Sequence, residues 1–337
     1  MSRTPLAPMA VIGAGSWGTA LAIQLARSGQ PVRLWGRDGS LIERLRAERR
    51  NGRYLPEAAF PAALEAVGEL PAALDQVRDL IVAVPSHAFR PTLESLRAHL
   101  APGSRIAWAT KGFETSTGLL PHQVVREVLG GRPGAVLSGP TFAREVGLGL
   151  PTAMTVASHD EPFAQALLER LSGPHFRVYT QPDLLGVEVG GAVKNVIAIG
   201  AGIADGMGFG ANTRVALITR GLTEMMRLGL ALGAARETFM GLAGLGDLVL
   251  TCTDDHSRNR RLGLALARGQ TLTEAQREIG QVVEGVTAAG AVQRVAARLE
   301  VEMPICAEVY RVMHENRPVR AAVQALMTRD ARAETEP

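Results

Sequence analysis

The stretch MAVIGAGSWG, residues 9–18, decides the fold of this chain. Its first four residues are apolar and predict a short buried strand, and the run Thr19–Arg27 predicts a helix. Between them lies a GxGxxG pattern. In such a strand–turn–helix unit, Gly13 makes the tight turn, Gly15 lets the backbone approach a pyrophosphate, and Gly18 lets the helix pack on the strand. The stretch therefore predicts a dinucleotide-binding domain.

The residues after the next strand bear on which dinucleotide fits. Residues 31–35 predict that strand, and Arg37 and Asp38 follow it. An acidic residue at this point binds the ribose 2′-hydroxyl of NAD(H), whereas an arginine accommodates the 2′-phosphate of NADP(H). Arg37 favours NADP(H), and Asp38 keeps NAD(H) open.

Five later segments extend the strand pattern, and the first three are nearly continuous apolar runs that end in polar residues, glycine or proline. Such runs are typical of buried parallel strands. The five segments are Leu80–Val84, Ile106–Ala109, Ala135–Leu137, Thr152–Ala157 and Phe176–Tyr179. Ligands bind beyond the carboxyl ends of the strands in a doubly wound sheet, so Lys111, just after the second segment, lies at the ligand-binding edge. The arginine-rich run Leu41–Arg53 predicts a helix with a solvated face.

The strand pattern stops after Asp183, and segments rich in Ala, Leu, Val and Arg predict helices from there on. Their predicted bounds are Val187–Ala204, Thr213–Leu232, Thr238–Leu242, Arg260–Ala267, Thr273–Ile279, Thr287–Leu299 and Pro304–Met313. A chain of 337 residues is long enough for two domains. We expect an α/β dinucleotide-binding domain with a doubly wound, Rossmann-like parallel sheet over residues 1–185, and an all-helical substrate and catalytic domain over residues 186–337.

Composition excludes several classes of protein. The net charge is only +3 and no basic run is interleaved with aromatic residues, which argues against a nucleic-acid partner. Apolar stretches are broken by glycine, lysine or aspartate, so we expect no membrane span, and without a signal-peptide pattern we expect a cytoplasmic protein. Cys252 and Cys306 form neither a disulfide framework nor a metal cluster, and no metal site is expected.

Lys194 is the first candidate catalytic residue, because lysine occurs only at positions 111 and 194 while the other 34 of 36 basic residues are arginine. Its neighbours from residue 187 to 203 are nearly all Val, Ile, Ala or Gly, which is typical of a buried helix. Burial lowers the pKa of an ammonium group toward neutrality, as a general acid or base requires. The alternative is a lysine that snorkels out of the core or pairs with a carboxylate.

The segment SRNRR, residues 257–261, is a candidate phosphate site. Ser257 can cap a helix whose first turn contains Arg258 and Asn259, and free N–H groups at a helix start together with a guanidinium bind phosphate well. The alternative is a capped surface helix with basic side chains. Asp247, between a glycine and an apolar run, is placed to orient a cationic partner.

These motifs together resemble bacterial NAD(P)-dependent glycerol-3-phosphate dehydrogenase. The matching pieces extend from residue 11 to about residue 310. They are GAGSWGTALA from Gly13, VPSH from Val84, ATKG from Ala109, SGPTFA from Ser138, GGAVKN from Gly190, GLGDLVLTCT from Gly244, SRNRR from Ser257 and QVVEG from Gln281.

The resemblance implies roles for individual residues, with Lys194 as the proton acceptor. The implied substrate-binding residues are Lys111, Gly139, Thr141, Lys194, Asp247, Ser257, Arg258 and Asn259. The implied cofactor-binding residues are Gly13, Gly15, Ser16, Trp17, Gly18, Arg37, Tyr54, Lys111, Ala143, Arg258, Val282 and Glu284. Arg37 and Tyr54 occupy positions that vary within the family.

The resemblance further implies an oxidoreductase that acts on a CH–OH group and uses NADPH or NADH. Its reaction is the reversible reduction of dihydroxyacetone phosphate to sn-glycerol 3-phosphate for glycerophospholipid synthesis, and the expected assembly is a homodimer. Two alternatives stay open: a related two-domain dehydrogenase of 3-hydroxy acids, and a nicotinamide-sensing regulatory protein without chemistry. SRNRR favours a phosphorylated substrate over the first, and the presence of Lys194 and Asp247 argues against the second.

Overall fold

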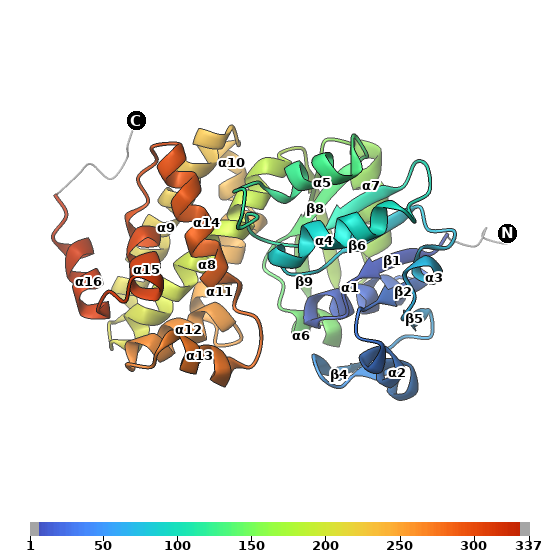
Figure 1. The fold of residues 1–337 in the computed structure, drawn as a ribbon, viewed down its shortest axis with the longest axis horizontal. Coiled ribbons are helices and arrows are strands. Elements are labelled where there is room, and N and C mark those ends of the chain that lie inside the picture. Colours follow the sequence, from blue (N-terminus) through green and yellow to red (C-terminus); the bar gives the residue numbers. More distant parts are fainter. Residues whose placement is uncertain (1–6, 331–337) are drawn as a thin grey trace.

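An eight-stranded sheet and its flanking helices form one half of the protein, and a bundle of helices forms the other (Figure 1). The computed structural model describes residues 7–330. The strand order in the sheet is β10-β9-β8-β7-β6-β1-β2-β5. The strands are β1 (Met9–Ile12), β2 (Val32–Trp35), β5 (Leu64–Val67), β6 (Asp79–Val82), β7 (Arg105–Trp108), β8 (Gly134–Ser138), β9 (Thr152–Ser158) and β10 (Phe176–Gln181). The predicted fold class, a Rossmann-like sheet followed by helices, is confirmed.

One strand pairing departs from the all-parallel sheet expected from the sequence. Strand β1 lies parallel to both β2 and β6, and β6, β7 and β8 continue in the same direction. Strand β9, however, pairs antiparallel with β8, with Leu137 opposite Val156, and β10 then runs parallel to β9. Buried strands of either direction share the same apolar pattern, so the sequence could not distinguish them.

The predicted helix Leu41–Arg53 is wrong at its C-terminal end. Helix α2 (Gly39–Glu48) stops early because Arg49 adopts the left-handed conformation, with φ of 50°. The chain then forms a small hairpin of β3 (Arg50–Asn51) and β4 (Leu55–Ala59), followed by β5, none of which was predicted. The Arg49 guanidinium donates to the carbonyl oxygens of Leu64 at 2.9 Å and Pro61 at 2.7 Å, which ties this excursion to the sheet edge.

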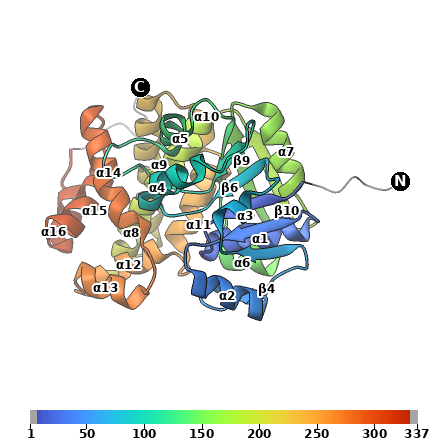
Figure 2. The same cartoon turned by 45° about the vertical axis from the view of Figure 1, so that its right-hand side comes forward.

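Helices cover both faces of the sheet (Figure 2). Apolar side chains of α1, α2, α6 and α7 share one core with the strands, and those of α4 and α5 share the core on the opposite face. The bounds are α1 (Ser16–Arg27), α3 (Leu70–Leu74), α4 (Ser86–Arg97), α5 (Pro121–Leu129), α6 (Ala143–Leu148) and α7 (Glu161–Leu171).

Helix α8 (Leu184–Gly206) is the core of the helical half. Around it lie α9 (Ala211–Leu232), α10 (Arg236–Phe239), the π-helical turn η1 (Leu242–Gly246), α11 (Asp247–Thr253), α12 (Arg258–Ala267), α13 (Leu272–Ile279), α14 (Glu284–Arg298), α15 (Pro304–His314) and α16 (Val319–Met327). Helices α8 and α12 approach closely, since a Cβ at Gly202 would collide with the carbonyl oxygen of Arg260, and one at Gly263 with that of Ile199. This contact holds the start of α12 against α8.

Most of the predicted helices of the helical half are present, but three elements of this half were missed. These are η1, α11 and α16. The predicted helix Thr238–Leu242 is interrupted, because α10 ends at Phe239 and Gly241 has extended backbone angles before η1 begins. The interruption places Asp247 at the first position of a new helix.

The junction between the two halves is short. Strand β10 ends at Gln181 and α8 begins at Leu184, where the Asp183 carboxylate accepts a hydrogen bond from the Gly186 N–H at 2.9 Å. Leu184 and Val187 pack in the core of the sheet half, so the first turn of α8 belongs to both halves. The division near residue 185 stays a prediction.

Helix α8 is long and apolar enough to cross a membrane, although the sequence predicted no such segment. It has 23 residues, and 94% of its most apolar 18-residue window is buried inside the protein. Its apolar surface is therefore covered by neighbouring helices, as in the core helix of a globular domain.

Candidate active site

Three charged side chains meet where the helical half faces the end of β7. Lys194 Nζ lies 2.5 Å from Asp247 Oδ1, and Lys111 Nζ lies 2.6 Å from Asp247 Oδ2. Lys194 comes from the middle of α8, Asp247 begins α11, and Lys111 lies in the loop after β7. Lys194 and Asp247 are almost completely buried. Tertiary structure thus brings three predicted substrate-site residues into one cluster.

Two glycines of α8 make room for this cluster. A Cβ at Gly191 would lie 3.3 Å from Cγ of Lys111, and one at Gly190 would lie 2.7 Å from the carbonyl oxygen of Ala243 in η1. A side chain at either position would push away the Lys111 stem or the turn that leads into Asp247. The two glycines of GGAVK therefore leave the space that both lysines need to reach one carboxylate.

The environment of the cluster lowers the pKa of the Lys194 ammonium group. Burial lowers the pKa of Lys194 to about 8, although the charge of Asp247 opposes this shift and that of Lys111 adds to it. Burial raises the pKa of Asp247, but the charges of Lys111 and Lys194 outweigh burial and hold that pKa below its usual value. At neutral pH one carboxylate thus lies between two ammonium groups. A buried amine that titrates near pH 8 can give or take a proton.

Thr251 completes the contacts of the Lys194 ammonium group. Lys194 Nζ donates to Thr251 Oγ1 at 3.0 Å, and the Thr251 hydroxyl donates to the Asp247 carbonyl oxygen at 2.6 Å. An ammonium group has three N–H donors, and within residues 7–330 two acceptors are found, Asp247 and Thr251. One donor is left for a substrate oxygen.

The start of α12 lies beside this part of α8. The Ser257 hydroxyl accepts from the Arg260 N–H at 3.2 Å and caps the helix as predicted. Asn259 Nδ2 donates to Asn195 Oδ1 at 2.9 Å, and Asn259 Oδ1 accepts from the Gly285 N–H at 2.9 Å. The half-buried Arg258 has no hydrogen-bond or ion-pair partner in the described part of the chain. Its guanidinium is therefore available to an anion.

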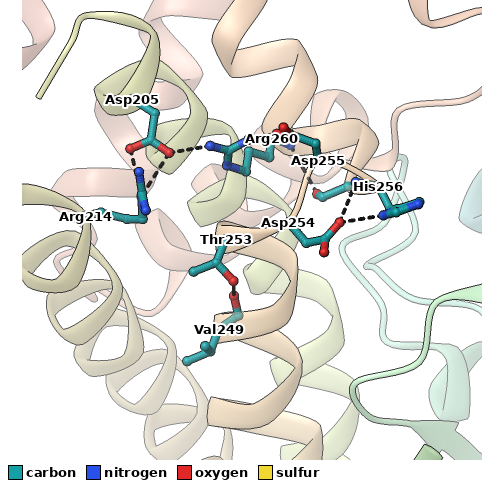
Figure 3. A network of polar contacts seen from close by, with 9 residues as sticks. Asp205, Arg214, Val249, Thr253, Asp254, Asp255, His256 and Arg260 are labelled. Carbon is teal, nitrogen blue, oxygen red and sulfur yellow. Dashed lines mark hydrogen bonds and ion pairs between the residues drawn. The ribbon is translucent and has the colours of Figure 1, made fainter. Parts of the chain in front are cut away.

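An ion-pair network anchors the loop that precedes α12 (Figure 3). Arg260 Nη2 lies 2.6 Å from Asp205 Oδ2 at the end of α8, and Arg260 also pairs with Asp255 in the loop. Asp205 accepts in addition from Arg214 Nε at 2.8 Å. The buried Arg260 thus joins α8, α9 and the loop that leads to Ser257 at the start of α12.

The loop after β8 approaches the same region. Gly139 has a φ of 131°, which only glycine adopts readily, and Thr141 Oγ1 donates to the Gly139 carbonyl oxygen at 3.1 Å. The Phe142 ring lies 5.6 Å, centroid to centroid, from the ring of His256, which precedes α12. The two predicted substrate loops therefore lie next to each other across the two halves.

The glycine loop after β1 has the geometry of a dinucleotide cradle. Gly13 has a φ of 121°, and a Cβ there would lie 2.6 Å from the Ala83 carbonyl oxygen. A Cβ at Gly18 would collide with the Gly13 carbonyl oxygen, whereas one at Gly15 would meet nothing within 4 Å. Helix α1 begins at Ser16 without a side-chain cap, so its first N–H groups are open to an anion.

The other predicted cofactor residues are spread over both halves. Trp17, Tyr54 and Ala143 pack against the core that contains α1, and the Trp17 Nε1 donor is buried without a partner among the described residues. Arg37 is exposed after β2, while the neighbouring Asp38 caps α2 by accepting from the Leu41 N–H at 3.2 Å.

In the helical half, the predicted cofactor residues Val282 and Glu284 lie at the start of α14. Val282 is exposed, and Glu284 accepts from Asn195 Nδ2 at 3.4 Å. Residues 7–330 contain no group of three or more His, Cys, Asp or Glu side chains that could hold a metal ion.

Two family models cover nearly the whole chain. The N-terminal model of NAD-dependent glycerol-3-phosphate dehydrogenase matches residues 8–164, and the C-terminal model of the same enzyme matches residues 183–324. The chain belongs to the NAD-dependent glycerol-3-phosphate dehydrogenase family.

Individual relatives of this dehydrogenase agree with the family models. A glycerol-3-phosphate dehydrogenase [NAD(P)+] from Nitrosococcus oceani is 58% identical over 325 residues, which are 96% of this chain and 94% of the relative. The crystal structure of glycerol-3-phosphate dehydrogenase from Coxiella burnetii is 48% identical, with a TM-score of 0.94, and the match covers 97% of this chain and all of that one. The yeast enzyme from Saccharomyces cerevisiae is 27% identical, with a TM-score of 0.82, over 95% of this chain and 99% of that one.

As a member of this dehydrogenase family, the chain is an NAD(P)-dependent oxidoreductase. Its own residues fit the cofactor, because the open space at Gly15 and the uncapped start of α1 leave room and N–H donors for a pyrophosphate.

Three residues of this glycerol-3-phosphate dehydrogenase site were not predicted from the sequence. Thr251 follows Asp247 by one helical turn, and that spacing is a usable signal. Asn195 directly follows Lys194, and Arg260 is part of SRNRR, but neither side chain could be assigned a partner from local sequence. Their partners, Glu284, Asn259 and Asp205, are distant along the chain.

Proposed function

We propose that this glycerol-3-phosphate dehydrogenase interconverts dihydroxyacetone phosphate and sn-glycerol 3-phosphate with Lys194 as the proton donor and acceptor. The observation that carries this proposal is the buried cluster in which Asp247 lies between Lys194 and Lys111, at 2.5 and 2.6 Å. No other lysine exists in the chain. Both amines are thus concentrated at one carboxylate beside the carboxyl end of a sheet strand.

Bound NADPH or NADH supplies the hydride that reaches C2 of the substrate. Lys194 gives its proton to the oxygen on C2 as negative charge develops there, so that the carbonyl becomes a hydroxyl group. Asp247 holds the Lys194 ammonium group in place through a 2.5 Å hydrogen bond. In the reverse direction the neutral amine takes the hydroxyl proton. Lys111, which contacts the other oxygen of Asp247, would favour the negative charge that develops on the substrate oxygen.

The substrate phosphate is proposed to bind at the start of α12. Arg258 has no other partner within the described chain, and a helix start together with a guanidinium is a suitable anion site. Ser257 and Asn259 hold this turn in shape, and Gly139 and Thr141 approach it from the loop after β8. Binding of the remote phosphate would position the reacting carbon at Lys194.

Cofactor binding is assigned to Gly13, Gly15, Ser16, Trp17, Gly18, Arg37, Tyr54, Lys111, Ala143, Arg258, Val282 and Glu284. The preference for NADP(H) rests on Arg37, whose exposed guanidinium is unpaired within residues 7–330. The neighbouring Asp38 is engaged as the cap of α2, which leaves it less suited to bind a ribose 2′-hydroxyl.

Three broader assignments complete the proposal. They are a role in glycerophospholipid synthesis, a cytoplasmic location and a homodimeric assembly. A sedimentation or light-scattering measurement of the purified chain tests the last of these.

An oxidation assay with both cofactors tests the proposed reaction. The absorbance of NADPH or NADH is expected to fall when dihydroxyacetone phosphate is added, and a 3-oxo acid without phosphate is expected to give no turnover. Turnover of the 3-oxo acid in place of the phosphate would favour a 3-hydroxy-acid dehydrogenase. Cofactor binding without turnover of either compound would favour a regulatory protein.

A further inference from the structure

A buried carboxylate links the strand that leads to Lys111 with the helix that carries Lys194. Glu188 lies in the second turn of α8 and is 3% exposed. Its Oε1 accepts from the Trp108 indole N–H at 2.8 Å and from the His122 backbone N–H at 2.9 Å. Its Oε2 lies 2.5 Å from His122 Nδ1. Two N–H donors and one imidazole nitrogen therefore converge on one carboxylate inside the core.

The position of this carboxylate relates it to the proton-transfer cluster. Trp108 is the last residue of β7 and precedes Lys111 by three residues. Glu188 precedes Lys194 by six residues in α8, which is about 9 Å along the helix axis. The hydrogen bond from Trp108 to Glu188 therefore connects the strand that leads to Lys111 with the helix that carries Lys194.

The separation of β7 and α8 can change very little. The Lys111 stem passes over Gly191 so closely that a Cβ there would lie 3.3 Å from Lys111 Cγ. A movement of α8 toward β7 would close this passage. A movement away would stretch the linked contacts that run from Lys111 through Asp247 of α11 to Lys194 of α8, at 2.6 and 2.5 Å. The loop is held on its other side by Thr110 Oγ1, which donates to the Val84 carbonyl oxygen at 2.7 Å.

Burial of a carboxylate at this point has a cost that apolar packing would avoid. Burial raises the pKa of Glu188, and its contacts with His122 and Trp108 only partly offset this. An apolar residue could fill the space, but it could not accept the Trp108 indole N–H, and a buried unpaired donor costs about 1–3 kcal/mol. The Glu188 carboxylate thus supplies the acceptor that the indole N–H of Trp108, at the end of β7, requires.

We propose that Glu188 is a positioning residue for proton transfer: through Trp108 and His122 it sets the separation of β7 and α8, and with it the geometry of Lys111, Asp247 and Lys194. The inference rests on the proposed role of Lys194.

Two substitutions of Glu188 separate positioning from bulk stability. Glu188→Gln keeps an acceptor for the Trp108 and His122 N–H groups, and its NH₂ can donate to a neutral His122 ring. Glu188→Ala removes all three contacts. Since a misplacement of about 1 Å can cost about 100-fold in rate, Glu188→Ala is expected to lower kcat for dihydroxyacetone phosphate reduction by about 10- to 100-fold. Glu188→Gln is expected to restore kcat to within about threefold of the unmodified chain.

The same proteins are titrated with NADPH, whose Kd is expected to change by less than about twofold in both variants. Glu224 provides a matched control, because it is also a buried carboxylate but accepts from the Ile305 and Cys306 N–H groups at the start of α15. Glu224→Ala is expected to lower Tm and leave kcat unchanged. An NMR spectrum resolves the indole N–H groups of the three tryptophans, and the Trp108 signal is expected to move in Glu188→Ala and stay in Glu188→Gln.

Four results would overturn the inference. They are an unchanged kcat in Glu188→Ala, an equal loss in Glu188→Gln, a loss of NADPH binding in parallel with kcat, and a kcat loss of the same size in Glu224→Ala. If Glu188→Ala fails to fold, Trp108→Phe decides, since it removes the indole donor together with part of the ring: a kcat loss without loss of NADPH binding supports positioning, and unchanged kcat refutes it. An unmodified protein that does not turn over dihydroxyacetone phosphate would instead refute the proposed function.

Discussion

Replacing Asp247 with asparagine is expected to lower the pKa of Lys194, and replacing Lys111 with methionine is expected to raise it. Asp247 lies 2.5 Å from one ammonium group and 2.6 Å from the other. Asp247→Asn keeps the shape of the side chain but removes its negative charge. That charge favours the protonated amine, so its loss lowers the pKa of Lys194. Lys111→Met keeps much of the stem but removes a positive charge. That charge opposes the protonated amine, so its loss raises the pKa of Lys194.

The size of the first effect follows from the geometry. At an effective dielectric constant of about 20, unit charges about 2.5 Å apart attract each other by about 6–7 kcal/mol. Desolvation cancels part of this attraction, and removing one partner from a buried pair costs about 3–5 kcal/mol. One pKa unit corresponds to about 1.4 kcal/mol. The pKa of Lys194, about 8 in the unmodified chain, is therefore expected to fall by about two to three in Asp247→Asn.

Two lysines in the whole chain make this measurement direct. Lysine labelled with ¹³C at Cε gives one signal for each, and Lys194→Ala identifies which is which. The chemical shift is followed from about pH 4 to about pH 11. Glu224→Gln serves as the control, because that carboxylate contacts backbone N–H groups and neither lysine, and it is expected to leave the Lys194 midpoint in place.

The rate is expected to follow the same titration. Reduction needs protonated Lys194, so its rate falls as the pH rises through about 8, and oxidation needs the neutral amine, so its rate rises through the same pH. Asp247→Asn shifts both limbs to lower pH. A Lys194 that titrates near its ordinary value of 10.5, or a midpoint that does not respond to Asp247→Asn, would refute the reasoning.

Three further substitutions test other parts of the site. Lys194→Ala is expected to lower turnover by at least about 100-fold while NADPH binding, followed by nicotinamide fluorescence, stays nearly intact; wild-type turnover would end the proposed role. Arg37→Asp is expected to weaken NADPH binding much more than NADH binding in parallel Kd measurements, and equal effects would contradict the assignment to the 2′-phosphate. Gly15→Val would fill the space that is open in the structure, so it is expected to weaken both cofactors alike with little change in Tm; unaltered Kd values would place the pyrophosphate elsewhere.

The features predicted well from the sequence are those whose causes are local. Gly13 needs a positive φ and Gly18 needs close packing on the strand, so the glycine loop could be read from six consecutive residues. The apolar runs of β1, β6 and β7 were located to within two residues for the same reason. The rarity of lysine was sufficient to single out Lys194 and Lys111, because composition belongs to the chain and not to its fold.

The features that were missed depend on which segments meet in space. The direction of β9 depends on its pairing with β8, and the early end of α2 depends on the contacts of Arg49 with Leu64 and Pro61. Strand direction and helix ends of this kind leave little trace in local pattern.

The site divides in the same way. Sequence alone determined that a dinucleotide loop, an isolated lysine in an apolar helix and a capped basic turn are present. Only the tertiary structure decided that Asp247, 53 residues beyond Lys194, lies between it and Lys111, and that Glu188 holds the indole of Trp108, 80 residues away. The reason is physical: backbone conformation responds to near neighbours, whereas the pKa of a buried amine depends on charges and burial that folding alone brings together.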